Sequence, residues 1–322
     1  MLPKSLPIKL SKKDREAIVE ELNRIDYMTP AQCRGALLRR YHELQHFYLN
    51  PPRSHIEARE LQPRDFFVHF RAQDFLSFGY IHALIEQQPQ LFLNALYSFN
   101  RYDQVIYNAS GYDHGAFAWQ VLIGYAANDD VYIDFMLPRS LPLTEGRVVC
   151  HIIVDCILAL RNPDLKAPAV DSAERFLQCK RTHYERAMIN ALLGILTQDV
   201  ERFSDALQAS LDYHRRSQIT FDRGLFKYMP VSSYGLLALA YGYFDSQQYR
   251  QIKHPKHDLW WSAFVAHNEQ QGYRVGQHLI RFDGELSFMN DAESMMEVKH
   301  TSVTEMREQA RQARREYARR QQ

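Results

Sequence analysis

The residues of this sequence that could support metal or acid–base chemistry are few. His151 and Asp155 lie four positions apart in "HIIVD", so on a helix they share one face. Such a pair could bind one metal ion, or the carboxylate could satisfy a buried histidine through a hydrogen bond. No second His–Asp set completes a metal site, and the chain has no Gly-rich phosphate loop, Gly-x-Ser-x-Gly elbow or His-Glu-x-x-His motif. We therefore expect no metal and no cofactor.

A second candidate is "RDFFVH", from Arg64 to His69, which resembles the Arg-polar-x-x-x-His pattern of the all-helical HEPN-type ribonucleases. In that family the Arg and His act on the scissile phosphate and the attacking 2′-hydroxyl, so the resemblance implies catalytic roles for Arg64 and His69. In a regular helix, however, residues five apart point about 140° away from each other. The pair would converge only in a distorted first turn or across a dimer, so a ribonuclease is the alternative function.

Charge and composition narrow the classes of partner. Among 322 residues, 39 Lys and Arg nearly balance 38 Asp and Glu, which gives no general reason to expect nucleic acid or an anionic membrane as partner. The four cysteines form no C-x-x-C pair, and "MLPKSLPIKL" lacks the apolar core of a signal peptide. The longest apolar run, residues 148–160, is too short to cross a membrane. We expect a cytoplasmic protein.

Helix start signals mark the N-terminal region, residues 1–110. "SKKD" at Ser11 resembles a capping box, and Thr29 followed by Pro30 predicts a second helix that ends before Pro51. Limited numbers of Gly and Pro, 13 of each, leave little room for the turns of an all-β fold. We expect this region to be helical and to form one continuous domain with residues 111–300.

Residues 111–300 repeat a helical hairpin. Residues 112–137 align with residues 182–207 at a constant offset of 70, and both segments place a Gly before an Asp turn. Two further units, near residues 146–180 and 232–252, give a spacing of about 35 residues per hairpin. The pattern predicts an all-α fold, a solenoid-like array of antiparallel helical hairpins. Unrelated hairpins in one bundle are the alternative.

Two segments depart from this rhythm. In "HLIRFDGELSFM", residues 278–289, Asp283–Gly284 stands between alternating apolar residues and favours a small β-hairpin, or alternatively a helix C-cap at Gly284. Residues 301–322 form a basic C-terminal helix or tail without an apolar stripe. Four of its arginines are candidate partner-binding residues: Arg307, Arg311, Arg314 and Arg315.

Residues 111–261 resemble the helical immunity protein 49 family of bacterial polymorphic-toxin systems. The likeness lies in "LIGYAANDDVYIDFMLP", "ERFLQCKRTHYERAMINALLGILTQDVERFSDALQASLDYHRRS", "YGLLALAYGYF" and "HPKHDLWWSAF". It implies an all-helical cytoplasmic protein without catalytic activity that binds a cognate toxin from a neighbouring cell. A general adaptor that holds peptides in a helical groove is a further alternative. The two differ in affinity, since an immunity protein binds one partner almost irreversibly.

Overall fold

The computed structural model describes residues 2–52, 57–107, 114–144, 146–216, 224–296 and 303–320. All regular secondary structure within these ranges is helical, which confirms the all-α class. The N-terminal α-helices are α1 (Lys12–Ile25), α2 (Pro30–Leu49), α3 (Pro63–His69), α4 (Ala72–Glu86) and α5 (Pro89–Tyr107). They are followed by α6 (His114–Ala126), α7 (Asp130–Met136), α8 (Val149–Arg161), α9 (Lys166–Gln178), α10 (His183–Thr197) and α11 (Val200–His214). The last are α12 (Val231–Tyr243), α13 (Ser246–Arg250), α14 (Ser262–Gln270) and α15 (Val303–Arg320), and the 3₁₀ helices are η1 (Pro163–Leu165), η3 (Gly224–Tyr228) and η4 (Gly284–Met295).

The first two helices begin where the sequence predicts. The Ser11 side chain accepts from the Asp14 N–H, and the Asp14 carboxylate accepts in return from the Ser11 N–H, which completes a capping box. Thr29 caps α2, Pro30 is its first residue, and Leu49 is its last. These local hydrogen bonds satisfy backbone donors that a helix cannot satisfy internally.

The predicted repeat appears as two hairpins with one turn geometry. In α6–α7 the N–H of Asp129 donates to the carbonyl of Gly124 over 3.0 Å. In α10–α11 the N–H of Asp199 donates to the carbonyl of Gly194 over 2.8 Å. The residue before each Asp has a positive φ, 56° and 60° respectively, as in a Schellman motif. Each Asp side chain then caps the second helix of its hairpin, so the aligned residues take the same conformation.

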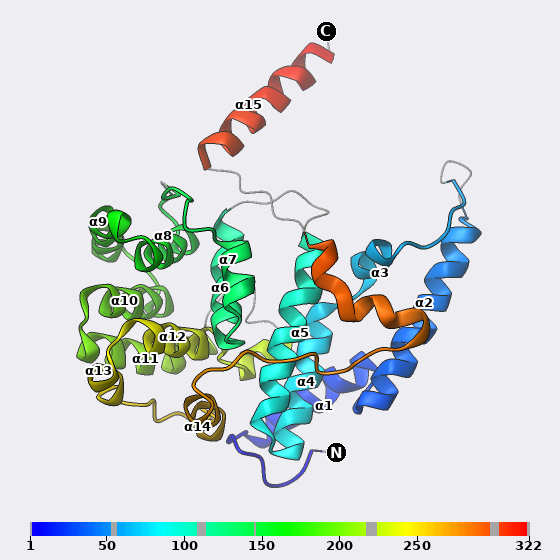
Figure 1. Cartoon of the computed structure of the whole chain (residues 1–322), viewed down its shortest axis with the longest axis horizontal. Helices are drawn as coiled ribbons and strands as arrows, with labels where there is room; N and C mark the ends of the chain where they lie inside the picture. Colours follow the sequence, from blue (N-terminus) through cyan, green and yellow to red (C-terminus); the bar gives the residue numbers. More distant parts are fainter. Residues whose placement is uncertain are drawn as a thin grey trace.

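The first helices of the four hairpins form a closed arrangement. Helix α6 packs against α8, α8 against α10, α10 against α12, and α12 returns to pack against α6 (Figure 1). The closing contact needs a glycine, because a Cβ at Gly235 of α12 would lie 2.1 Å from the carbonyl oxygen of Leu122 in α6. An open solenoid would keep these two helices apart, so the hairpins form a closed bundle.

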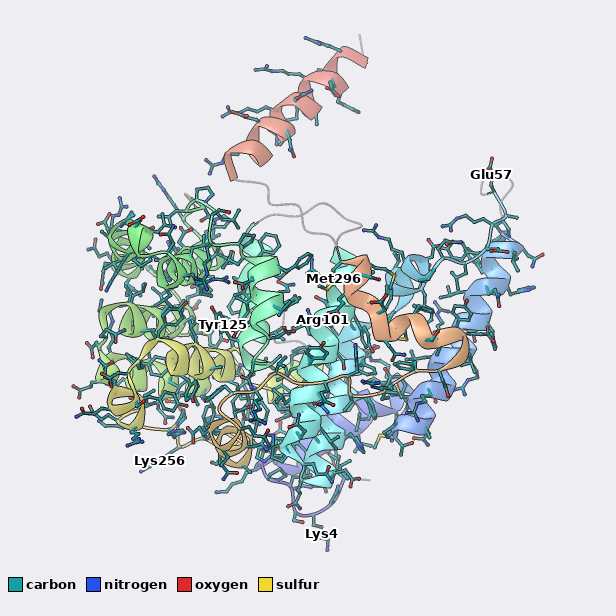
Figure 2. All side chains as sticks on the ribbon, in the orientation of Figure 1. Lys4, Glu57, Arg101, Tyr125, Lys256 and Met296 are labelled. Carbon is teal, nitrogen blue, oxygen red and sulfur yellow. The ribbon has the colours of Figure 1, made fainter. Side chains whose placement is uncertain are left out.

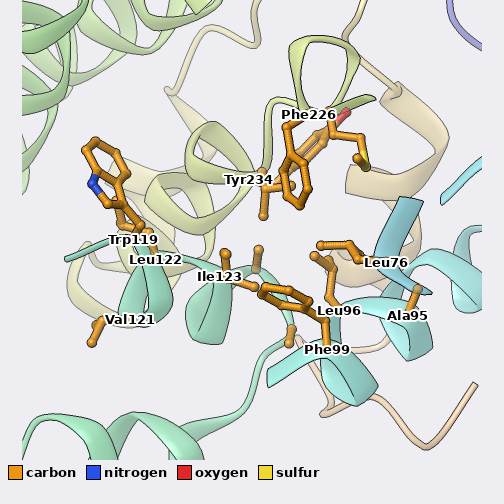
Figure 3. Close-up of a cluster of buried hydrophobic side chains, with 14 of the residues drawn as sticks. Leu76, Ala95, Leu96, Phe99, Trp119, Val121, Leu122, Ile123, Phe226 and Tyr234 are labelled. Atoms are coloured by element: carbon orange, nitrogen blue, oxygen red, sulfur yellow. The ribbon is translucent and has the colours of Figure 1, made fainter. Parts of the chain in front are cut away.

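One hydrophobic core joins the N-terminal helices to this bundle. Helices α4 and α5 pack as a hairpin in the centre of the molecule, and α5 contacts α6 (Figure 1). Figure 3 shows Leu96 and Phe99 of α5 beside Ile123 of α6 and Phe226 of η3 in one buried cluster. Because residues from both sides share this cluster, burial couples the stability of the two regions.

The β-hairpin expected at residues 278–289 is wrong, and so is the alternative helix C-cap. Residues 278–283 form an irregular strap along α5, in which the N–H of Leu279 donates to the Ser98 hydroxyl over 2.8 Å. Gly284, with φ +56°, opens η4 instead of ending a helix. The Asn290 side chain bonds both the N–H and the carbonyl of Phe282, so it supplies the hydrogen bonds that a partner strand would have made.

The C-terminal segment forms the helix α15, whose described side chains, residues 307–319, are all exposed. In Figure 1 this helix lies apart from the other helices. Throughout the described ranges, no helix combines the length and apolarity that a membrane span requires.

Candidate functional site

Arg64 and His69 lie at the second and last positions of α3. The His69 ring contacts Tyr48, with 3.5 Å between its Nε2 and the phenol oxygen, and lines a small pocket between α1, α2 and α3. Arg64 is not among the residues that line this pocket. Helix α3 is one α-helical run, so the two side chains leave it in directions about 140° apart. Within one chain, this geometry does not support a shared catalytic site.

The four candidate arginines of the tail share one side of α15. Arg307, Arg311, Arg314 and Arg315 are spaced by four, seven and eight positions, which places them on neighbouring turns of one helix face. All four are exposed. The tail therefore presents a continuous basic stripe to the solvent.

Asp155 of the candidate pair His151 and Asp155 has a structural role in α8. The Asp155 carboxylate accepts from the N–H of Thr144 over 2.6 Å and from the Thr144 hydroxyl over 3.1 Å, all of them buried. It thus fixes the segment that precedes α8. Over the described ranges, no three His, Cys, Asp or Glu side chains gather as metal ligands would.

The candidate site is a groove of about 810 Å³ where α6, α7, α8 and α12 meet. Its lining is rich in tyrosine, and Figure 2 shows one of these residues, Tyr125, where α6 faces the helices of the closed bundle. We call it the tyrosine groove; its polar lining residues are Tyr125, Asn128, Asp130, Asp134, Arg139, Arg161, Tyr241, Tyr243 and Tyr273.

Two tyrosines that line the groove, Tyr241 and Tyr273, form a cluster with Tyr249, which is not part of the lining. Tyr241 stacks on Tyr273 with ring centroids 4.3 Å apart, and Tyr249 contacts Tyr241 edge to face at 5.1 Å. The hydroxyls of Tyr249 and Tyr273 lie 2.7 Å apart, and the Tyr249 hydroxyl also donates to Glu269 over 3.1 Å. Tyr241 remains 42% exposed. Its ring thus packs against two other tyrosines while part of its surface stays open to the solvent.

This cluster depends on the backbone conformation at the end of α14. Gly272 and Tyr273 both have positive φ, 60° and 53°, and the N–H of Tyr273 donates to the carbonyl of Asn268 over 2.8 Å. The turn ends α14 and directs the Tyr273 ring toward α12, where it meets Tyr241. A glycine suits the first of these two positions because it adopts positive φ without strain.

The opposite wall carries the charges. Arg161, at the end of α8, is buried, donates to the carbonyl of Ile133 over 3.2 Å and forms an ion pair with Asp134. Asp130 and Arg139 are exposed beside it. Because two acids and two arginines line the groove, its charges balance.

Burial raises the pKa of Tyr125 well above its usual range. Burial also raises the pKa of Tyr243, although a hydrogen bond with Tyr125 lowers the pKa of Tyr243. These phenols stay protonated at physiological pH and act as neutral donors and acceptors. Tyrosines are common among the anchor residues of protein interfaces.

Sequence reasoning did not find this groove, since its tyrosines come from three segments that are far apart along the chain. The only local signal is the aromatic run "YGYF" at residues 241–244. No protein-family model, curated protein or solved structure matches this chain.

Proposed function

We propose that this protein is an immunity protein, which neutralises a cognate interbacterial toxin by stoichiometric binding. The resemblance of residues 111–261 to the immunity protein 49 family motivates this proposal. A toxin that turns over many targets must be almost wholly sequestered, so the complex needs a dissociation constant near nanomolar or below, about −12 kcal/mol.

The observation that carries the proposal is the tyrosine groove. An interface of that affinity needs rigid aromatic and arginine anchors at its centre, surrounded by polar contacts. Tyr241, in contact with Tyr249 and Tyr273, is such an aromatic anchor, and the buried Arg161 fixes the groove wall through its ion pair with Asp134. Ordering these residues before binding lowers the entropic cost of association.

The basic stripe of α15 supplies long-range attraction in this proposal. Arginines that dock on an acidic toxin surface raise the association rate more than they change the affinity. The proposed complex therefore has two parts: the tyrosine groove holds the toxin, and the tail accelerates encounter.

The test is protection from the toxin encoded by the neighbouring gene. The full-length protein is co-expressed with that toxin, survival is measured, and the complex is recovered by pull-down. We expect survival and a one-to-one complex. Death despite full-length expression, with no complex recovered, would end the immunity proposal.

Tyr241→Ala then tests the groove. We expect binding to weaken by at least about tenfold, as for a hot-spot residue. Phe47→Ala is a matched control, because Phe47 is also 42% exposed but lies on α2, away from the groove. Equal losses in the two variants would remove the groove from the interface.

The ribonuclease alternative makes an opposite prediction. Purified protein should not cleave RNA if the immunity proposal is right. RNA cleavage that His69→Ala abolishes would instead favour an active site built from Arg64 and His69. An adaptor would bind several unrelated peptides at micromolar affinity, which a titration with the toxin and with unrelated peptides separates from tight binding of one partner.

A further inference from the structure

A second pocket, of about 460 Å³, lies between the start of α8 and the end of α9. We call it the arginine pocket; its lining residues are Gly146, Arg147, Ile152, Ser172, Arg175, Phe176, Cys179 and Arg181. Three of these are arginines and none is acidic. In a chain of nearly balanced charge, such a local excess of positive charge lacks a compensating partner in the lining.

One arginine of the pocket covers its aromatic ring. The guanidinium carbon of Arg181 lies 4.0 Å above the Phe176 ring, and its Nη2 donates to the carbonyl of Arg147 over 3.4 Å. Arg175 pairs with Asp171 over 2.9 Å, but both side chains are more than 60% exposed. Since such surface pairs contribute little, Arg175 can exchange that partner for another anion.

The wall beside Arg147 is fixed before any ligand binds. The buried Asp155 carboxylate holds Thr144 through two hydrogen bonds. Two residues on, a Cβ at Gly146 would lie 1.6 Å from the Nδ1 atom of His151. The backbone at Gly146 therefore lies directly on that ring, and only glycine fits. His151 and Asp155 therefore position the segment before α8 that carries Arg147.

The pocket suits carboxylates on side chains better than a compact phosphate. Arg175, Phe176 and Cys179 belong to the last turn of α9 and its C-cap, the end at which the helix dipole is partially negative. Phosphate sites commonly use backbone N–H groups at helix N-termini. Here long arginine side chains must hold the anion away from the backbone, while Phe176 and Ile152 offer apolar contact to the methylene groups of glutamate.

We propose that the arginine pocket binds an acidic, Glu- and Asp-rich segment of the partner protein. This inference rests on the proposed function, because it names the chemistry by which one part of the partner is recognised. The guanidinium groups of Arg147, Arg175 and Arg181 would form charge-assisted hydrogen bonds with successive carboxylates.

The test uses the full-length protein and a fluorescein-labelled octaglutamate peptide, with binding followed by fluorescence anisotropy. We expect saturable binding that weakens as salt rises, because the interaction is electrostatic. Octalysine should not bind. Arg147→Glu/Arg175→Glu should weaken binding by at least about tenfold, whereas Arg250→Glu, an exposed arginine on α13, should not.

Melting temperatures within about 4 °C of the wild type show that each variant is folded. If the double reversal does not fold, Arg147→Gln/Arg175→Gln replaces it. Three results would overturn the inference: absence of octaglutamate binding, binding that the folded double variant retains, and displacement of the peptide by inorganic phosphate at a lower concentration than free octaglutamate requires. The assay contains no toxin, so failure here leaves the protection assay to decide the proposed function.

Discussion

The α6–α7 and α10–α11 hairpins have the same turn geometry, but the aspartate of the turn is buried in the first hairpin and exposed in the second. In α10–α11, Asp199 is exposed and caps α11 through the N–H of Arg202 over 2.9 Å. In α6–α7, Asp129 caps α7 in the same way but is buried, and its carboxylate also pairs with Arg101 of α5 over 3.0 Å. Figure 2 shows Arg101 in the middle of the molecule.

The glycines of the two turns differ as well. A Cβ at Gly194 would lie 2.8 Å from the backbone nitrogen of Phe203, so α10 and α11 touch through their main chains. The atoms nearest to a Cβ at Gly124 would be side-chain atoms, those of Ile133 and Tyr132 at 3.0 Å. A local signal therefore sets the turn in both hairpins, while the surrounding helices decide what each residue of the turn contributes to stability.

The largest expected effect is a difference in stability between substitutions of Asp129 and Asp199. Asp129→Ala should lower the free energy of unfolding by about 3–5 kcal/mol, because it leaves Arg101 buried with its main partner gone. Asp199→Ala should cost only about 1 kcal/mol, the value of a lost helix cap. Urea unfolding at pH 7 measures both, and equal losses would mean that the buried ion pair adds nothing.

A smaller effect is expected from the two glycines. Gly194→Ala should destabilise the protein by about 1–3 kcal/mol, since the new methyl group must push two backbones apart. In Gly124→Ala the side chains of Tyr132 and Ile133 need to shift by only a few tenths of an ångström, and the better helix propensity of alanine offsets the strain by about 1 kcal/mol. We expect this variant to match the wild type in thermal unfolding. A larger loss for Gly124→Ala than for Gly194→Ala would contradict the packing difference.

A pH series tests a second buried carboxylate that contacts the α6–α7 hairpin, that of Asp103. Burial raises the pKa of Asp103 on α5 to about 7, although a hydrogen bond with Gln120 of α6 lowers it. The folded state therefore holds this proton more tightly than the unfolded state, so stability falls as pH rises from about 4 to 7. Asp103→Asn should remove that loss and be the more stable form at pH 8, by on the order of a few kcal/mol.

The quantity to compare is the difference in unfolding free energy between wild type and Asp103→Asn at pH 5, 6, 7 and 8. Taking the difference cancels other titrating groups, such as His214, whose pKa burial lowers to about 4 and whose contribution is lost as pH falls. A difference that stays constant with pH would show that Asp103 does not titrate in this range.

The smallest effect on stability is expected for the tail. Removing residues 303–322 should change the unfolding free energy by less than about 0.5 kcal/mol, because its described side chains are exposed. The same deletion should slow association with the toxin in stopped-flow measurements at low salt. An unchanged association rate would exclude the arginine stripe from encounter, and full protection by the truncated form would remove the tail from the interface.

Sequence alone was enough for the features that a few neighbouring residues control. The caps at Ser11 and Thr29 and the equivalent turns at Asp129 and Asp199 appear as expected. The helical periodicity of residues 182–207 also predicts that Leu193 and Phe203 are buried, and both side chains are fully buried. Side-chain caps, glycine placement and helical periodicity act over three to five residues, so their signals are readable without a partner segment.

Only the tertiary structure decided how these elements close and what they enclose. The strap at residues 278–283 pairs with the Asn290 side chain and lies on α5. No local sequence pattern predicts these contacts. The contact of Gly235 with Leu122 closes the bundle across more than a hundred residues of chain, and the tyrosine groove forms where that closure brings distant segments together. Such contacts depend on how distant surfaces fit and on which polar groups become buried, and neither property belongs to any single stretch of sequence.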